Sequence, residues 1–160
     1  MIIFDLDGTL ANIEHRRHMV GPGIGREQKA DWDAFNMACV HDTPITPVVK
    51  LFQLLWRTGV VLQIWSGRSD LVKPDTQIWL TKHVFEGDAR WNDPETHLWV
   101  PLRMRRQHDY TPDDKLKEQW LDQLVQSGTN PDLIVDDRNK VVNMWRRRGL
   151  VCLQCAEGDF

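Results

Sequence analysis

Acidic, hydroxyl-bearing and basic residues form three short clusters, and each cluster directly follows an apolar run. The clusters are Asp5-Leu6-Asp7-Gly8-Thr9, Ser66-Gly67-Arg68 and Asp136-Asp137-Arg138. Two carboxylates on one tight loop can supply an oxygen for in-line attack on phosphorus and a second group for proton transfer. The three clusters therefore predict phosphoryl-transfer chemistry.

A carboxylate that attacks a phosphate brings two anions together, so this chemistry requires a cation. Asp136 and Asp137 are expected beside Asp5, and their hard oxygen atoms suit Mg²⁺. The predicted metal ligands are Asp5, Asp7, Asp136 and Asp137. Donors must also hold the phosphate oxygens as charge develops, and the residues predicted for this role are Thr9, Ser66, Gly67 and Lys117.

Further basic residues are candidates for substrate binding. Arg68 and Arg138 directly follow two of the clusters, so we expect them to flank the bound phosphate. The alternative for both is a salt bridge to the acidic sheet edge. His15, Arg16 and Arg17 belong to the run His15-Arg16-Arg17-His18, which is either a clamp for phosphate or sugar or a solvated loop surface.

Short apolar runs alternate along the chain with segments of helical periodicity, which predicts an α/β fold with a largely parallel sheet flanked by helices. The expected strands are Ile2–Phe4, Val60–Trp65, Leu98–Leu102, Leu133–Val135 and Leu150–Gln154. The expected helices lie around residues 48–55, 76–84, 116–125 and 141–145. Since ligands bind beyond the carboxyl ends of such strands, the three clusters and Lys117 should meet at one edge.

The length and composition predict one domain. The chain has 160 residues, of which 41% are hydrophobic, enough for a single sizeable core. We therefore expect residues 1–160 to form one domain. Residues 12–44 are mostly polar and include Gly21-Pro22-Gly23-Ile24-Gly25, so we expect a small cap-like insert after the first strand.

The clusters, taken in order with Lys117, resemble the four motifs of the haloacid dehalogenase (HAD) superfamily of phosphatases. This resemblance implies a Rossmann-like, HAD-type sheet. It implies that Asp5 is the nucleophile and that Asp7 is the general acid and then the general base. It also implies that Ser66 and Lys117 hold the phosphate and that the acidic pair Asp136-Asp137 binds the metal.

A narrower resemblance is to the phosphatase domain of phage-type polynucleotide kinases. It is carried by Ile64–Arg68, Asp113–Glu118, Val135–Arg147 and Gly158–Phe160. The domain removes 3′-phosphates from nucleic-acid ends, so the resemblance implies such an end, or a nucleotide, as substrate. No GxxxxGK[ST] loop occurs in the sequence, and we expect no kinase domain in this chain. The segment after the first cluster is longer than in that domain.

Two other functions remain open. A lid over the nucleophile favours a compact substrate, so the chain could be a nucleotidase that acts on free nucleoside monophosphates, whereas an open mouth admits a polynucleotide end. A receiver-like phospho-switch also combines carboxylates, a hydroxyl and a lysine. The second carboxylate, Asp7, favours the enzyme, because it speeds hydrolysis of an acyl phosphate.

The remaining composition bears on the cell compartment. The formal net charge is −3, which argues against broad adhesion to duplex DNA or to a membrane surface. No apolar run approaches the ~18 residues of a membrane span, and no signal-peptide pattern is present, so we expect a soluble cytoplasmic protein. Cysteines number three, and we expect Cys152 and Cys155 to be buried thiols rather than a redox or metal pair.

Seven of the eight tryptophans fall into two groups. Trp56, Trp79, Trp120 and Trp145 lie on helical apolar stripes and are expected in the core. Trp32, Trp91 and Trp99 lie off these patterns and are candidates for stacking against a nucleobase.

Overall fold

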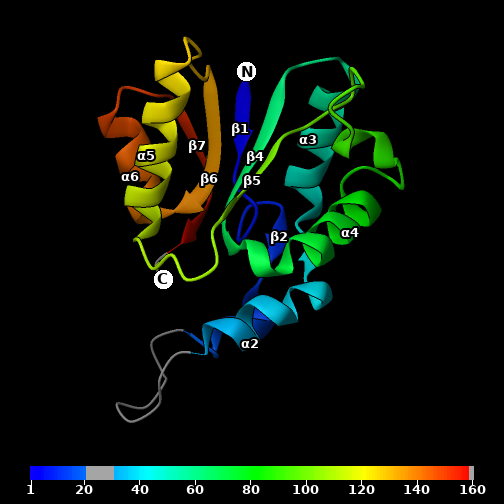
Figure 1. Ribbon diagram of the computed structural model, residues 1–160, viewed down its shortest axis with the longest axis vertical. Helices are drawn as coiled ribbons and strands as arrows, with labels where there is room; N and C mark the ends of the chain where they lie inside the picture. Colours follow the sequence, from blue (N-terminus) through cyan, green and yellow to red (C-terminus); the bar gives the residue numbers. More distant parts are fainter. Residues whose placement is uncertain (21–30, 159–160) are drawn as a thin grey trace.

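The computed structural model describes residues 1–20 and 31–158, and a five-stranded parallel sheet forms its centre (Figure 1). The strands follow the order β5-β4-β1-β6-β7. Their bounds are β1 Ile2–Phe4, β4 Leu62–Ser69, β5 Leu102–Arg105, β6 Leu133–Arg138 and β7 Cys152–Gly158. The parallel α/β fold predicted from the sequence is confirmed. The predicted glycine-rich stretch 21–25 and the terminal residues 159–160 lie outside the described residues.

Helices cover both faces of the sheet. Helices α3 (Thr46–Arg57) and α4 (Lys73–His83) pack on one face, and α5 (Asp113–Gln126) and α6 (Asn139–Arg147) on the other (Figure 1). Successive side chains of a strand point to opposite faces, so Phe4 joins the core under α3, and its neighbour Ile3 joins the core under α5 and α6. This two-sided burial explains why β1 is apolar throughout.

Several strands differ in extent from the predicted ones. Strands β4 and β6 run past the expected apolar ends, because the polar residues of the clusters keep strand geometry. Strand β7 also runs further than expected, to Gly158. Strand β5 begins at Leu102, where the predicted strand ends. The residues before β5 form hydrogen bonds outside the sheet, since the Val100 amide donates to the Trp91 carbonyl and the Leu98 carbonyl accepts from Trp56 Nε1.

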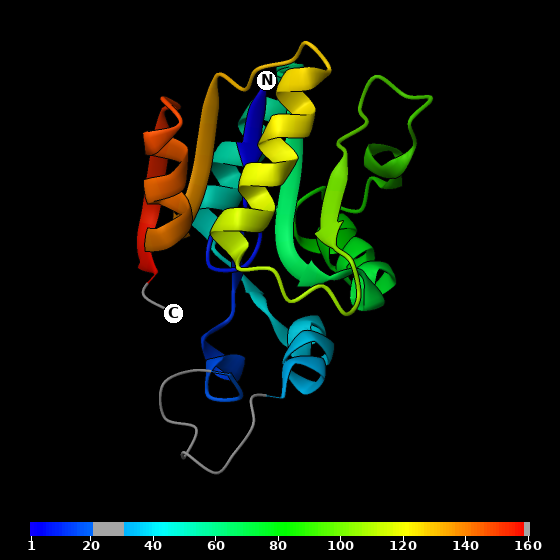
Figure 2. The same cartoon turned by 60° about the vertical axis from the view of Figure 1, so that its left-hand side comes forward.

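The described parts of the segment between β1 and α3 lie beyond the carboxyl ends of the strands (Figures 1 and 2). Its first and last parts, β2 (Ala11–Asn12) and β3 (Thr43–Pro44), pair in an antiparallel ribbon. Between them lie α1 (Glu14–Arg17), α2 (Trp32–Met37) and the 3₁₀ helix η1 (Ala38–His41). Two further 3₁₀ helices lie elsewhere in the chain: η2 (Asp70–Val72) follows β4, and η3 (Ala89–Asn92) follows α4.

The tryptophans bear out one prediction and overturn part of another. The four expected core tryptophans are buried: Trp56, Trp79, Trp120 and Trp145. Trp91 is also fully buried, stacks on Phe85 at 4.5 Å between ring centroids, and donates from Nε1 to Thr81. The prediction that Trp91 stacks on a nucleobase is therefore wrong, because this ring belongs to the core.

The cysteines also differ from expectation in one respect. Cys152 is buried as predicted, and burial raises its pKa to about 12. Cys155 is exposed, so the prediction of a buried thiol is wrong there.

None of the helices in the described residues is long and apolar enough to cross a membrane.

Candidate active site

The loop after β1 presents the first two carboxylates. The Asp5 amide donates to the Val135 carbonyl at 2.9 Å, which ties the end of β1 to β6. The loop then closes on the Leu6 carbonyl, which accepts the Leu10 and Ala11 amides at 2.9 and 2.8 Å. This tight turn fixes the backbone on which Asp5 is carried.

Lys117, on α5, lies against the carboxylates at the ends of two strands. Its Nζ donates to Asp5 Oδ1 at 2.5 Å and to Asp136 Oδ2 at 2.9 Å, and all three residues are buried. Burial alone would lower the pKa of Lys117, but the charges of Asp136 and Asp5 raise it, so the group is an ammonium. For Asp5, burial raises the pKa, Lys117 opposes this, and the charges of Asp136 and Asp137 add to the rise.

Asp5, Asp136 and Asp137 form a compact group of oxygen ligands. One carboxylate oxygen from each lies within 4.8 Å of the others, and no other such group occurs among the described residues. Burial, followed by the charge of Asp136, raises the pKa of Asp137 to about 7. Lys117 contacts Asp5 and Asp136 but not Asp137, so the three carboxylates, when ionised, carry excess negative charge that a hard divalent cation would balance.

The side chain of Asp7 lies outside this carboxylate group and binds two arginines instead. Arg16 Nη2 donates to Asp7 Oδ1 at 2.7 Å, and Arg68 Nη2 donates to the same oxygen. Burial would raise the pKa of Asp7, but the charges of Arg68 and Arg16 outweigh it and lower the pKa to about 2. The Asp7 carboxylate is thus paired with guanidinium groups, and its predicted role as a metal ligand stays a prediction.

A second acid, Asp42, holds the same two arginines. Its carboxylate accepts from Arg16 Nε and Nη2, both at 2.7 Å, and from Arg68 Nη2 at 2.8 Å. His15 Nε2 lies 2.9 Å from Asp42 Oδ1. Two buried guanidinium groups thus face two carboxylates, Asp42 and Asp7, which balances charges that would be unstable alone. Asp42 is the residue of this network that the sequence did not indicate.

The basic run after the first cluster is divided between two environments. Arg16 is fully buried and turned toward Asp7 and Asp42, so this part of the predicted loop surface is not solvated. Arg17 forms an ion pair with Glu14 at 2.6 Å and lines the cavity described below. Arg17 is thus the member of the predicted substrate-binding run that the structure places at the cavity wall.

The last residues of β4 pack tightly against α5. Arg68 N donates to Ser66 Oγ at 3.1 Å, and Ser66 is fully buried. A Cβ on Gly67 would lie 2.4 Å from Asp113 Oδ1, so a side chain does not fit at this position. In the loop after β1, Thr9 is likewise buried, and its hydroxyl donates to Asp137 Oδ1 at 3.4 Å. The proposed contacts of Thr9 and Ser66 with phosphate stay predictions.

Asp113, at the start of α5, joins two arginines to this end of β4. Arg138 and Arg105 each donate to one of its carboxylate oxygens. Arg105 also donates from Nε to the Gly67 carbonyl at 2.8 Å. Arg138 therefore forms a salt bridge, and Arg68 does the same with Asp7 and Asp42.

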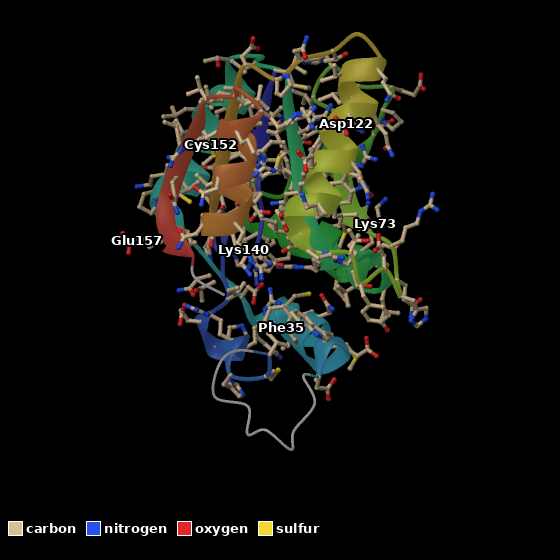
Figure 3. The ribbon with its side chains drawn as sticks, turned by 90° about the vertical axis from the view of Figure 1, so that its left-hand side faces the viewer. Phe35, Lys73, Asp122, Lys140, Cys152 and Glu157 are labelled. Carbon is tan, nitrogen blue, oxygen red and sulfur yellow. The ribbon has the colours of Figure 1, made fainter. Side chains whose placement is uncertain are left out.

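A cavity of about 690 Å³ lies where these groups meet. This volume is in the range of small-molecule sites. Its floor includes Asp5, Asp7, Lys117, Asp136 and Asp137. One wall comes from α1 and α2, and another from residues 105–113 between β5 and α5. Figure 3 labels Phe35, which lines the cavity from α2.

Comparison with known proteins identifies the family. The family model for the polynucleotide kinase PNKP phosphatase domain matches residues 1–160. The chain belongs to this family. It is therefore a HAD-type phosphatase, that is, a phosphoric monoester hydrolase.

Solved structures similar to this PNKP-type phosphatase agree with the assignment. A chain of the structure of the Pnkp1/Rnl/Hen1 RNA repair complex is 28% identical, with a TM-score of 0.72 over 99% of this chain and 43% of that chain. A second structure of the Pnkp1/Rnl/Hen1 complex gives 29% identity, a TM-score of 0.73 and coverage of 99% and 46%. The phosphatase thus spans less than half of these chains. A putative phosphatase from Clostridium difficile shares the fold at 13% identity, with a TM-score of 0.61 and coverage of 96% and 83%.

Proposed function

We propose that this phosphatase removes the terminal 3′-phosphate of a nucleic acid through an aspartyl-phosphate intermediate on Asp5. The observation that carries the proposal is the placement of Asp5 at the cavity floor, with its carboxylate 2.5 Å from Lys117 Nζ and grouped with Asp136 and Asp137. The family match and the likeness to a chain of an RNA repair complex support a nucleic-acid end as substrate.

In the first step, an Asp5 oxygen forms a bond to phosphorus and the bond from phosphorus to the sugar oxygen breaks. Asp7 gives its proton to that oxygen, because an unprotonated sugar oxygen leaves poorly. In the second step, Asp7 takes a proton from water, the water oxygen bonds to phosphorus, and the bond to Asp5 breaks. Inorganic phosphate leaves, and the Asp5 carboxylate is restored.

The pairing of Asp7 with Arg16 and Arg68 fits the second step directly, since an ionised carboxylate is the form that accepts a proton. For the first step Asp7 must be protonated. A phosphate dianion bound beside it would raise its pKa, because a nearby like charge disfavours the ionised form. Lys117 would hold a phosphate oxygen as charge develops.

Asp5, Asp136 and Asp137 fit a Mg²⁺ ion, because they offer three hard oxygen ligands in a buried group of excess negative charge. When bound, the ion would neutralise the approaching anions.

We also propose that residues 12–44 act as a small cap. Supporting this, Asn36 Oδ1 accepts from the Ser69 amide at 3.3 Å, which joins α2 to the end of β4 at the wall of the cavity.

The test compares kcat/KM on a 3′-phosphorylated oligonucleotide, the 5′-phosphorylated oligonucleotide of the same sequence, nucleoside 3′- and 5′-monophosphates, and a nitrophenyl phosphate. We expect the 3′-phosphorylated oligonucleotide to give the highest value. Higher values on free mononucleotides would instead make the protein a nucleotidase. An aspartyl phosphate that persists on the protein for many minutes without hydrolysis would indicate a phospho-switch rather than a catalyst.

A further inference from the structure

Two exposed aromatic side chains line the cavity from different segments. Trp32, at the start of α2, is 49% exposed, and Tyr110, between β5 and α5, is 81% exposed. Large aromatic rings left open beside a catalytic cavity are available for stacking against a ligand. The cavity floor already holds the nucleophile Asp5, so a ring at its wall would meet the part of the substrate next to the phosphate.

The Tyr110 side chain is exposed to solvent, but hydrogen bonds hold the backbone on both sides of it. Arg105 Nη1 donates to the carbonyls on both sides of it, at 2.9 Å to Asp109 and 2.6 Å to Thr111. The same guanidinium donates from Nε to the Gly67 carbonyl at 2.8 Å. The backbone of Tyr110 is therefore held in position relative to the end of β4.

Trp32 is tied to the same end of β4 from the other wall of the cavity. Asn36 Nδ2 donates to the Trp32 carbonyl at 2.7 Å, while Asn36 Oδ1 accepts from the Ser69 amide at 3.3 Å. Arg16, held by Asp7, donates to the Phe35 carbonyl at 3.1 Å, and its guanidinium lies 4.1 Å from the centroid of the Phe35 ring. Helix α2 is thus anchored to the catalytic loop as well as to β4.

We propose that Trp32 and Tyr110 form a subsite for the nucleobase next to the scissile phosphate. The inference rests on the proposed function and names the part of the substrate that the cavity wall recognises. Stacking on an aromatic face accepts every base, so the subsite selects nucleotide ends over other phosphate esters without reading sequence. Because both residues sit on anchored backbone, binding needs to order their side chains but not the backbone that carries them.

The test uses two 3′-phosphorylated oligonucleotides that differ only at the last nucleotide, one with a normal base and one with an abasic tetrahydrofuran residue. Trp32→Ala and Tyr110→Ala should each lower kcat/KM on the normal substrate ~10-fold, as expected for the loss of one stacking partner. On the abasic substrate both variants should match the wild type. Trp32→Phe and Tyr110→Phe keep an aromatic face and should retain most of the activity.

Trp99→Ala is the matched control, because Trp99 is 46% exposed and is not among the described residues that line the cavity. It should leave both substrates unaffected. Equal losses on the normal and abasic substrates, or no loss on either, would overturn the subsite while leaving the proposed function standing. Wild-type enzyme that hydrolyses a nitrophenyl phosphate but neither oligonucleotide would end the proposed function and the subsite together.

Discussion

Lys117 donates a hydrogen bond to Asp5, with Nζ 2.5 Å from Oδ1, across a separation of 112 positions in the sequence. The contact joins the first helical turns of α5 to the loop after β1, and Asp136 accepts from the same ammonium. In the absence of substrate, Lys117 compensates buried negative charge. With a phosphate bound to Asp5, the same donor is close enough to hold a phosphate oxygen.

Lys117→Ala should lower turnover ~10²-fold or more, because a charged donor to the transition state is lost. Lys115→Ala is the matched control, since Lys115 is exposed and pairs with Glu118 at 3.4 Å on the surface of the same helix. It should change turnover little. Steady-state kinetics on a nitrophenyl phosphate check both variants, and equal effects would show that the lysine has been assigned wrongly.

Chelation should abolish turnover, and Mg²⁺ should restore it, because the carboxylates of Asp5, Asp136 and Asp137 repel an anionic substrate when no cation balances them. Binding can be followed without catalysis. Mg²⁺ should raise the melting temperature of the wild type, since a ligand that binds only the folded state stabilises it. Asp137→Asn should reduce that rise. Full activity in excess chelator would contradict the metal site.

Asp42→Ala should destabilise the protein by ~3–5 kcal/mol, because it leaves Arg16 and Arg68 with one carboxylate between them in a buried site. It should also lower activity, since these arginines position Asp7. Urea unfolding and kinetics measure the two effects. Glu14→Ala removes only the exposed pair with Arg17, so its effect on unfolding should stay within ~1 kcal/mol. Similar losses in both variants would argue against the network.

Gly8→Ala and Gly87→Ala separate backbone strain from steric exclusion. Both glycines have φ of +87°, a region that a residue with a Cβ enters at ~1–2 kcal/mol. A Cβ at Gly8 would lie 2.1 Å from Asp137 Oδ2, whereas at Gly87 nothing lies within 4 Å. Gly87→Ala should therefore cost only stability, and Gly8→Ala should also eliminate turnover by displacing Asp137. Comparable activity in the two variants would contradict this geometry.

The convergence of Asp5, Lys117 and Asp136 could be predicted from the sequence, because two of them follow apolar strands and parallel strands end at one edge. The core tryptophans were predictable for a similar reason, since helical spacing places them on buried stripes. Trp91 was not, because it lies in the short 3₁₀ helix η3, which has no such period. The start of strand β5 was predicted wrongly, because the apolar residues before Pro101 are not part of the sheet; the Val100 amide, for example, donates to the Trp91 carbonyl.

The environment of Asp7 could not be predicted. Arg16 stands in a polar run that is typical of a surface, and its burial depends on Asp42, which lies 26 positions away in a segment without clear periodicity. A buried arginine is stable only with its partners in place. The pairing therefore depends on how the segment between β1 and α3 folds back on the sheet, which local sequence patterns do not determine.

The division of labour between Asp5 and Asp7 can be tested with two variants. Asp5→Asn removes the nucleophile and should abolish both turnover and any covalent phosphate. Asp7→Asn keeps the nucleophile, so it should still be labelled slowly by a nitrophenyl phosphate, whose leaving group needs no proton. A mechanism in which activated water attacks the phosphate predicts no covalent label in either variant.

The most direct measurement is mass spectrometry of protein that is acid-quenched during turnover. The account predicts phosphate on the peptide that contains Asp5, released by hydroxylamine as expected for an acyl phosphate, and absent from Asp5→Asn. Asp7→Asn with a nitrophenyl phosphate should accumulate the same label. Robust turnover by Asp5→Asn, or unlabelled Asp5 in wild-type protein quenched at several times during turnover, would contradict the central claim.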